Sequence, residues 1–136
     1  MDLSPGTTVF HRIGTDVVRI PRIQALHERY GTQFLNRVYT VCEQQYCLAS
    51  PRHLHSRLAG RWAAKEAVTK ALGTGWRGIG YREIEIVRKP SGEPTVCLHG
   101  RAALRVAPYS QLEWQLSFSH DGDYAVATVL LVGTLG

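Results

Sequence analysis

The chain has 136 residues, of which 44% are hydrophobic and 20% are charged, and this composition fits one compact globular domain. Lys and Arg number 16 against 11 Asp and Glu, so the formal net charge of +5 favours anionic partners: nucleic acid, phosphorylated cofactors or acidic proteins. The basic residues form no long run, which argues against a simple nucleic-acid-binding tail.

The cysteines and the apolar runs indicate the compartment. The N-terminal MDLSPGTT has no basic-then-apolar signal pattern, and the longest apolar run is too short to span a bilayer as a helix. Cys42, Cys47 and Cys97 are a poor disulfide framework and suit a reducing compartment, so we expect a cytoplasmic protein without a membrane segment. Cys42 and Cys47 lie near His53 and His55, but no second cysteine pair supports a zinc site there.

Extended and then helical patterns open the chain. A strand is predicted over Val9–Val18, interrupted near Gly14, with Asp16 at or beside its end. Pro21 begins a predicted helix whose apolar residues recur at helical spacing, and Gly31 ends it.

The middle of the chain is predicted to be helical. A short helix is expected around Phe34–Val38, and Thr40 precedes Glu43 by three residues, which is the capping-box signature of a further helix. A long helix is expected over about Arg52–Leu72, and Gly73 is its stop signal.

The second half alternates between strands, turns and one short helix. In chain order we expect a strand at Glu83–Arg88, a turn at Lys89–Pro94, a strand at Thr95–Leu98, a helix at Arg101–Ala107, a half-buried strand at Trp114–Ser119, a turn at His120–Asp123 and a final strand at Tyr124–Val132. The whole pattern predicts an α+β fold, in which the long helix packs on a largely antiparallel sheet.

The long helix carries the first candidate chemistry. Wound at about 100° per residue, it has apolar side chains on every side, so it is predicted to be buried. Glu66 falls in one of its most apolar sectors with Lys70 one turn further on the same face, whereas Arg61 and Lys65 point to a different side. The two could form an ordinary i, i+4 ion pair. A buried carboxylate is costly unless it is paired or holds a metal, and Mg²⁺ uses carboxylate oxygens.

Three other segments supply candidate partners for Glu66. Asp16 is the natural second carboxylate because sites are commonly built at strand ends, although it could be a plain turn aspartate. Gly73, Thr74 and Gly75 are a helix C-cap by default, but such a segment also lets a phosphate approach the backbone. His120 would suit phosphate binding at a strand end, and no Gly-x-Ser-x-Gly elbow accompanies it to support a hydrolase.

Five motifs occur together in a characteristic order along nearly the whole chain. They are IGTDVVRI, FLNRVYTVCE, RWAAKEAVTKALGTG, GEP and LSFSHDGDYAVA. With them the chain resembles the acyl carrier protein synthase family of 4′-phosphopantetheinyl transferases. The length suits the short, single-domain branch, so the resemblance implies one transferase domain over residues 1–136, with residues 1–8 as an N-terminal extension. Arg12 departs from the family, which commonly has a glycine at that point.

The resemblance implies an activity and a set of roles. A Mg²⁺-dependent enzyme of this kind moves phosphopantetheine from coenzyme A to a serine of an acyl carrier protein, and adenosine 3′,5′-bisphosphate leaves. Asp16 and Glu66 would hold Mg²⁺, with Glu66 the base for the serine hydroxyl. Lys70 would neutralise developing charge or protonate the leaving phosphate, and His120 would bind the phosphates. The remaining nucleotide-site residues would be Gly73, Thr74, Gly75 and Pro94.

The resemblance also implies partners. Arg22 and Arg29 are seven residues apart, so they project from roughly one side of the first helix and would face an acidic carrier protein. Family members are similar homotrimers with sites between protomers. Neither a membrane nor a nucleic acid is expected as a partner. Two alternatives stay open: a basic nucleic-acid-binding domain, and a catalytically silent relative acting as an assembly partner.

Overall fold

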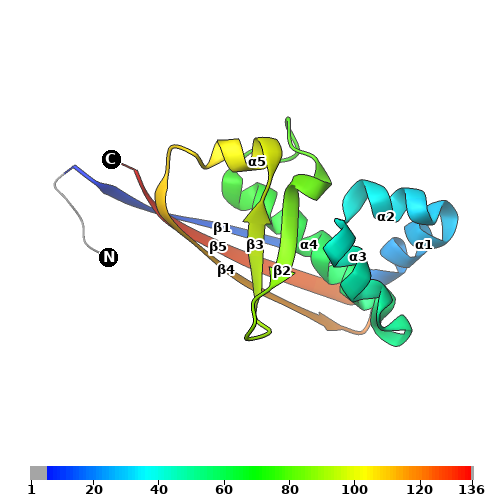
Figure 1. The fold of residues 1–136 in the computed structure, drawn as a ribbon. Coiled ribbons are helices and arrows are strands. Elements are labelled where there is room, and N and C mark those ends of the chain that lie inside the picture. Colours follow the sequence, from blue (N-terminus) through cyan, green and yellow to red (C-terminus); the bar gives the residue numbers. More distant parts are fainter. Residues whose placement is uncertain (1–5, 136) are drawn as a thin grey trace.

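A computed structural model of the chain describes residues 6–135. Figure 1 shows helices on one side of a long, tapering sheet, with a short hairpin beside them. The elements in chain order are β1 (Thr8–Arg19), α1 (Ile20–Tyr30), α2 (Thr32–Val38), α3 (Val41–Leu48), a 3₁₀ turn (Pro51–His53), α4 (Leu54–Leu72), a second 3₁₀ turn (Tyr81–Glu83), β2 (Ile84–Arg88), β3 (Pro94–Leu98), α5 (Gly100–Arg105), β4 (Ser110–Asp121) and β5 (Tyr124–Leu135). The predicted α+β class is confirmed.

The three long strands form one antiparallel sheet in the order β1-β5-β4, and β2 and β3 form a separate antiparallel hairpin. Helix α4 packs on β1 and β5. Side chains alternate between the two faces of the sheet. The face toward α4 buries Ala127 and Val129, whereas the opposite face leaves Ile13 70%, Val17 59% and Val126 39% exposed. An apolar surface therefore covers part of the side away from the helices.

Gly14 lets β1 and α4 touch through their backbones. A Cβ added at Gly14 would lie 1.9 Å from the carbonyl oxygen of Ala67, so no side chain fits there. The strand was predicted to break near Gly14, and that prediction is wrong: β1 runs without interruption from Thr8 to Arg19 and pairs with β5 throughout. The glycine serves close packing rather than a turn. Asp16 consequently lies inside the strand, not at its end.

Two glycine stop signals and one capping box end or begin helices in the structure, as predicted. Gly31 ends α1 with a φ of 57°, and Gly73 ends α4 in a left-handed conformation with a φ of 75°. The capping box is present, because the Thr40 hydroxyl accepts from the Glu43 backbone N–H and the Glu43 carboxylate accepts from the Thr40 backbone N–H. Two turn boundaries were wrong. Pro94 already belongs to β3, and His120 and Asp121 extend β4, leaving Gly122 and Asp123 as the turn.

Helix α4 is buried, as predicted, and two of its charged residues are buried with it. Lys65 is 0% exposed and Arg61 2% exposed; the helical wheel placed both on a different side from Glu66 without indicating what would cover them. The Lys65 ammonium donates to Glu43 Oε1 at 2.8 Å and to two backbone carbonyls. Burial lowers the pKa of Lys65 and the Glu43 carboxylate opposes that shift. Within residues 6–135, no helix is both long and apolar enough to cross a bilayer.

Candidate active site

Asp16 and Lys70 meet across the contact between β1 and α4. The Lys70 ammonium donates to the Thr15 carbonyl oxygen at 2.8 Å and to Asp16 Oδ1 at 3.2 Å. The Asp16 side chain is 20% exposed and that of Lys70 is 54% exposed, so the pair lies at the surface of the contact. In the part of the chain that the structure describes, Lys70 pairs with Asp16 and not with Glu66. The alternative of a simple i, i+4 ion pair is therefore wrong.

Glu66 is held by two aromatic side chains from the segment after α4. Trp76 Nε1 donates to one carboxylate oxygen at 3.0 Å, and the Tyr81 hydroxyl donates to the other at 3.2 Å. The ring centroids of Trp76 and Tyr81 lie 3.9 Å apart, so the two donors form one packed unit. Burial, and then the charge of Glu66, raise the pKa of Tyr81 to about 12. Tyr81 therefore stays a hydrogen-bond donor at neutral pH.

Asp16 and Glu66 offer the kind of oxygen ligand that a small hard cation such as Mg²⁺ uses. Asp16 lies two residues after Gly14 in β1, and Glu66 immediately precedes Ala67 in α4, so both residues are near in sequence to the point where the two backbones touch. A carboxylate offers about four lone-pair sites, so one donor on each oxygen of Glu66 leaves room for a cation. Mg²⁺ prefers oxygen ligands and commonly takes one or two carboxylates together with substrate phosphates.

The loop that ends α4 follows Lys70 by three residues. Gly73 and Gly75 have φ values of 75° and 54°, which favour glycine, and the Thr74 hydroxyl donates to the Gly75 carbonyl at 2.8 Å. An Arg12 guanidinium nitrogen lies 3.9 Å from the position of a Cβ on Gly73. Arg12 thus brings a positive charge to the glycine loop, whose Gly73 and Thr74 backbone N–H groups already donate to the Lys70 and Thr69 carbonyls.

His120 lies in a different place, on the rim of a cationic pocket of about 270 Å³ beside the N-terminal half of α4. Three guanidinium groups there surround the Tyr46 ring, with Arg57, Arg61 and Arg88 at 4.1, 4.2 and 4.8 Å from its centroid. The pocket lining, which includes no acidic residue, is Tyr46, His53, Ser56, Arg57, Gly60, Arg61, Arg88, Phe118, Ser119, His120 and Ala125.

Arg61 is the key group of this pocket. It is almost wholly buried, its Nε has no hydrogen-bond partner within the described chain, and burial lowers its pKa. A buried cation without an anion is costly, so the pocket favours an anionic ligand. Pro94 belongs to the same neighbourhood, because it is the cross-strand partner of Arg88.

The predicted site residues therefore fall into two groups. Asp16, Glu66, Lys70 and the Gly73–Gly75 loop lie at the C-terminal end of α4, whereas His120 and Pro94 lie beside its N-terminal half. Arg61 and Lys70 are nine residues apart on one helix, which places them roughly 13 Å apart along its axis. Sequence reasoning missed Trp76, Tyr81 and the arginine cluster.

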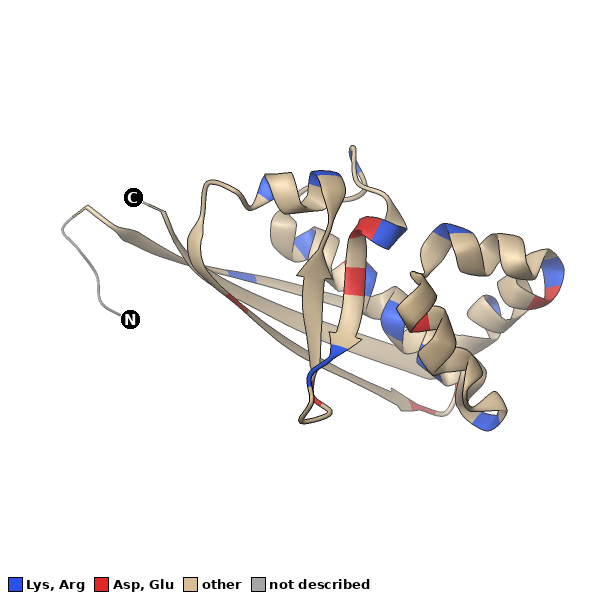
Figure 2. Ribbon diagram, in the orientation of Figure 1, with Lys and Arg blue, Asp and Glu red and all other residues tan. Residues whose placement is uncertain are grey.

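Arg22 and Arg29 are both exposed on α1. The Arg22 guanidinium lies 5.5 Å from the centroid of the Trp62 ring, and that of Arg29 lies 5.2 Å from the Tyr30 ring. A groove of about 450 Å³ begins beside this helix and is lined by Leu26, Tyr30, Gln33, Phe34, Arg37, Val38, Trp62 and Tyr81. Its lining includes Tyr81, one of the two donors to Glu66. Figure 2 shows basic residues on α1, α2 and α4 rather than in a single stripe.

Within residues 6–135, Cys42, Cys47, His53 and His55 do not come together as a group of three or more potential metal ligands. Cys47 is buried, and burial raises the pKa of its thiol to about 11, while Cys42 is exposed. His55 instead approaches His27, with ring nitrogens 3.1 Å apart.

Comparison with known proteins identifies the family. A family model described as "4′-phosphopantetheinyl transferase superfamily" matches residues 12–129. A holo-[acyl-carrier-protein] synthase of Gloeobacter violaceus is 70% identical over 128 residues, covering 94% of this chain and 97% of the relative.

Two solved structures share the fold. The ACPS-CoA complex of Chronobacterium ammoniagenes matches with a TM-score of 0.76 and 33% identity, over 90% of this chain and 96% of that one. The holo-[acyl-carrier-protein] synthase of Helicobacter pylori in complex with coenzyme A matches with a TM-score of 0.74 and 30% identity, over 88% and 98%. The resemblance drawn from the motifs is confirmed, and the chain belongs to the 4′-phosphopantetheinyl transferase superfamily, among its holo-[acyl-carrier-protein] synthases.

Proposed function

We propose that this chain transfers 4′-phosphopantetheine from coenzyme A to a serine of an apo acyl carrier protein in a Mg²⁺-dependent reaction. The observation that carries the proposal is the pairing of Lys70 on α4 with Asp16 on β1, beside the point where the backbones of the two elements touch. The relatives' names state the same activity, and two of the matching structures are described as complexes with coenzyme A.

The residues divide the chemistry between them. Asp16 and Glu66 would hold Mg²⁺, which when bound polarises a phosphoryl oxygen and helps to orient the reactants. Glu66 accepts the proton of the carrier serine, directly or through a water. The serine oxygen then bonds to the phosphorus next to pantetheine, and the bond from that phosphorus to adenosine 3′,5′-bisphosphate breaks. Lys70 neutralises the charge on the leaving phosphate or protonates it. Positioning and electrostatics carry most of such a transfer.

The cationic pocket supplies the phosphate site. The unpartnered Arg61 Nε, together with Arg57, Arg88 and His120, would bind phosphate groups of coenzyme A. Pro94 flanks that pocket, while Thr74 and Gly75 would contact the nucleotide at the other end of α4.

We infer a homotrimer with sites between protomers. The two groups of site residues are separated along α4, so neighbouring protomers could each supply one group to a shared site. The apolar sheet face that exposes Ile13, Val17 and Val126 is available for such an interface. Sedimentation showing a fully active monomer at assay concentration would contradict this arrangement.

The acidic carrier protein would dock on α1. Arg22 and Arg29 are exposed there, and the groove beside the helix is lined in part by Tyr81, which donates to Glu66. Replacing both arginines by Glu should raise the KM for the carrier protein at least about tenfold, because each rim arginine contributes roughly 1 kcal/mol. The KM for coenzyme A should change little.

A matched control carries the same change of charge elsewhere. Arg82 and Arg101 are also exposed, so a variant with both replaced by Glu should keep a normal KM for the carrier protein. Equal effects of the two double variants would mean that net charge, not docking on α1, sets carrier affinity.

The decisive experiment is mass spectrometry of an apo carrier protein incubated with this protein, coenzyme A and Mg²⁺. A mass gain of one phosphopantetheine is expected, and excess chelator should abolish it. Asp16→Ala and Glu66→Ala should lose activity while staying folded, whereas Glu93→Gln, an exposed carboxylate, should not. An unmodified carrier under every condition would favour the catalytically silent alternative, and full activity in chelator would exclude the metal. Nucleic-acid binding without coenzyme A binding would favour the other alternative.

A further inference from the structure

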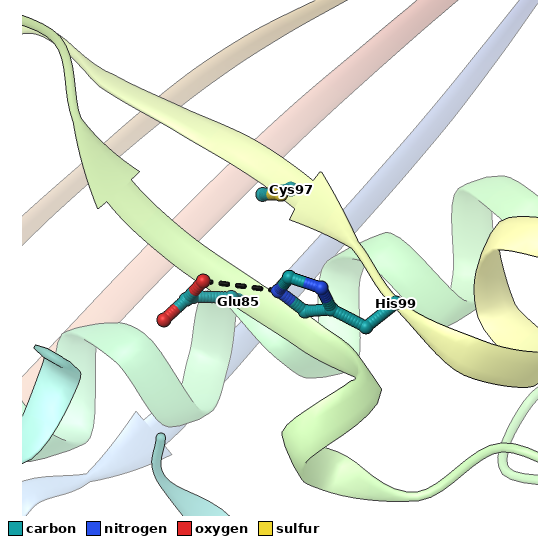
Figure 3. A group of neighbouring side chains, drawn as sticks. All are labelled: Glu85, Cys97 and His99. Atoms are coloured by element: carbon teal, nitrogen blue, oxygen red, sulfur yellow. Dashed lines mark hydrogen bonds and ion pairs between the residues drawn. The ribbon is translucent and has the colours of Figure 1, made fainter. Parts of the chain in front are cut away.

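A cluster of three different potential metal ligands lies on the small hairpin, outside the site described above. Glu85, Cys97 and His99 each offer one donor atom, and these atoms all lie within 4.8 Å of one another (Figure 3). In the described part of the chain this is the one group of at least three such side chains that meets this geometry. We propose that Glu85, Cys97 and His99 form a binding site for a divalent cation of the zinc class, separate from Asp16 and Glu66.

The backbone places the three side chains on one face. Glu85 on β2 and Cys97 on β3 are direct cross-strand partners, so their side chains project to the same side of the hairpin. His99 follows Cys97 by two residues, so its side chain lies on the same side of the hairpin as that of Cys97. The His99 backbone N–H donates to the Glu83 carbonyl at 2.8 Å, so its position is fixed although β3 ends at Leu98.

The side-chain geometry requires only a small adjustment to bind a metal. Glu85 Oε1 already lies 3.0 Å from His99 Nε2, and the Thr40 hydroxyl donates to Glu85 Oε2, which orients the carboxylate from behind. With metal–ligand bonds of about 2.0–2.3 Å, tetrahedral ligands are roughly 3.3–3.8 Å apart. Side-chain rotation of Cys97 and His99 can close the remaining gap without moving the strands.

The donor set selects the class of cation. A thiolate, an imidazole and a carboxylate together suit Zn²⁺ or Co²⁺, whereas Mg²⁺ requires oxygen ligands. The thiolate and carboxylate charges would balance a divalent cation when the imidazole is neutral. The His99 side chain is 48% exposed, so a cation has access from solvent and a water can take the fourth position. This donor set differs from the pair of carboxylates at the candidate active site.

The test uses Co²⁺ as a spectroscopic probe on the full chain. We expect one thiolate-bound Co²⁺ per protomer, counted from the near-ultraviolet absorption band of a thiolate bound to cobalt. Zn²⁺ should displace the cobalt, and excess Mg²⁺ should not. Cys97→Ser should remove the band, and His99→Gln should weaken the affinity at least about tenfold. Cys42→Ser and His55→Gln are the controls and should bind as the wild type does.

Several outcomes would overturn the site. These are the absence of a thiolate band, a band that persists in Cys97→Ser, and binding that is lost in Cys42→Ser or His55→Gln. Each would mean that Glu85 and His99 form only an ion pair. Circular dichroism checks the fold of every variant. Because the His99 side chain is half exposed, His99→Gln should fold normally, and it decides the test if Cys97→Ser fails to fold. Transfer activity is a separate readout, so its loss or survival does not bear on this site.

Discussion

Replacing Gly14 by Ala tests whether the contact between β1 and α4 positions the candidate active site. The new Cβ would lie 1.9 Å from the Ala67 carbonyl oxygen and 2.8 Å from its carbonyl carbon. Restoring a separation of 3.0 Å from that oxygen requires a movement of about 1.1 Å, and both neighbours are backbone atoms that cannot rotate away. Strand and helix must therefore move apart at this point.

The expected magnitudes follow from that displacement. Overpacking of a tight interior costs about 1–3 kcal/mol, and a clash with backbone belongs at or above the upper end of that range. Asp16 moves with β1 while Glu66 and Lys70 move with α4, so the reacting groups separate. A misplacement of about 1 Å can cost about 100-fold in rate. Gly14→Ala should therefore lose both stability and activity.

Urea unfolding and the carrier-modification assay measure the two losses. Gly80→Ala is the matched control, because a Cβ on Gly80 meets nothing within 4 Å and its φ of −94° suits any residue. That variant should stay within about 0.5 kcal/mol of wild-type stability and keep its activity. Wild-type stability in Gly14→Ala would refute the packing argument, and a destabilised Gly14→Ala with full kcat below its unfolding transition would refute the link to the active site.

Two other variants test buried and hydrogen-bonded groups. Lys65→Met leaves the Glu43 carboxylate buried without its cation, so the free energy of unfolding in urea should fall by about 3–5 kcal/mol. A fall of less than about 1 kcal/mol would contradict the pairing. Tyr81→Phe removes one donor to Glu66, so kcat should fall roughly tenfold with little change in the KM for coenzyme A, whereas unchanged kcat would mean that Trp76 suffices.

Burial, and then the neighbouring His27, lower the pKa of His55 in the folded chain. At pH values near the ordinary histidine pKa of 6.5, the unfolded chain therefore binds more protons than the folded chain, and acidification favours unfolding. The melting temperature should therefore fall less from about pH 7.5 to about pH 5.5 in His55→Gln than in the wild type, and equal slopes would contradict this.

The sequence predicted the elements whose signals are local. Pro21 and Gly31 bound α1, the Thr40–Glu43 box begins α3 and Gly73 ends α4, because each of these signals acts through backbone geometry within one turn. The prediction at Gly14 was wrong because the role of this glycine depends on a distant contact. A glycine in a strand can mark a break or a close approach, and only the position of Ala67, 53 residues further along the chain, decides between them.

The candidate site divides in the same way. Asp16, Glu66 and Lys70 could be selected because their types and motifs match a known chemistry. The contacts of these residues could not be predicted. Helical spacing pairs Lys70 with Glu66, but in the structure Lys70 donates to Asp16 and to the Thr15 carbonyl on the neighbouring strand.

Sequence reasoning placed Lys65 on a different side from Glu66 but could not show what covers it there, which is α3 with its Glu43 carboxylate. A helical wheel gives the direction of a side chain but not what it meets. Arg61 shows why this matters for function. Its burial beside Tyr46 without a partner for Nε is the strongest indication of an anion site in the described chain, and it arises only when the hairpin, α3 and β4 close around α4.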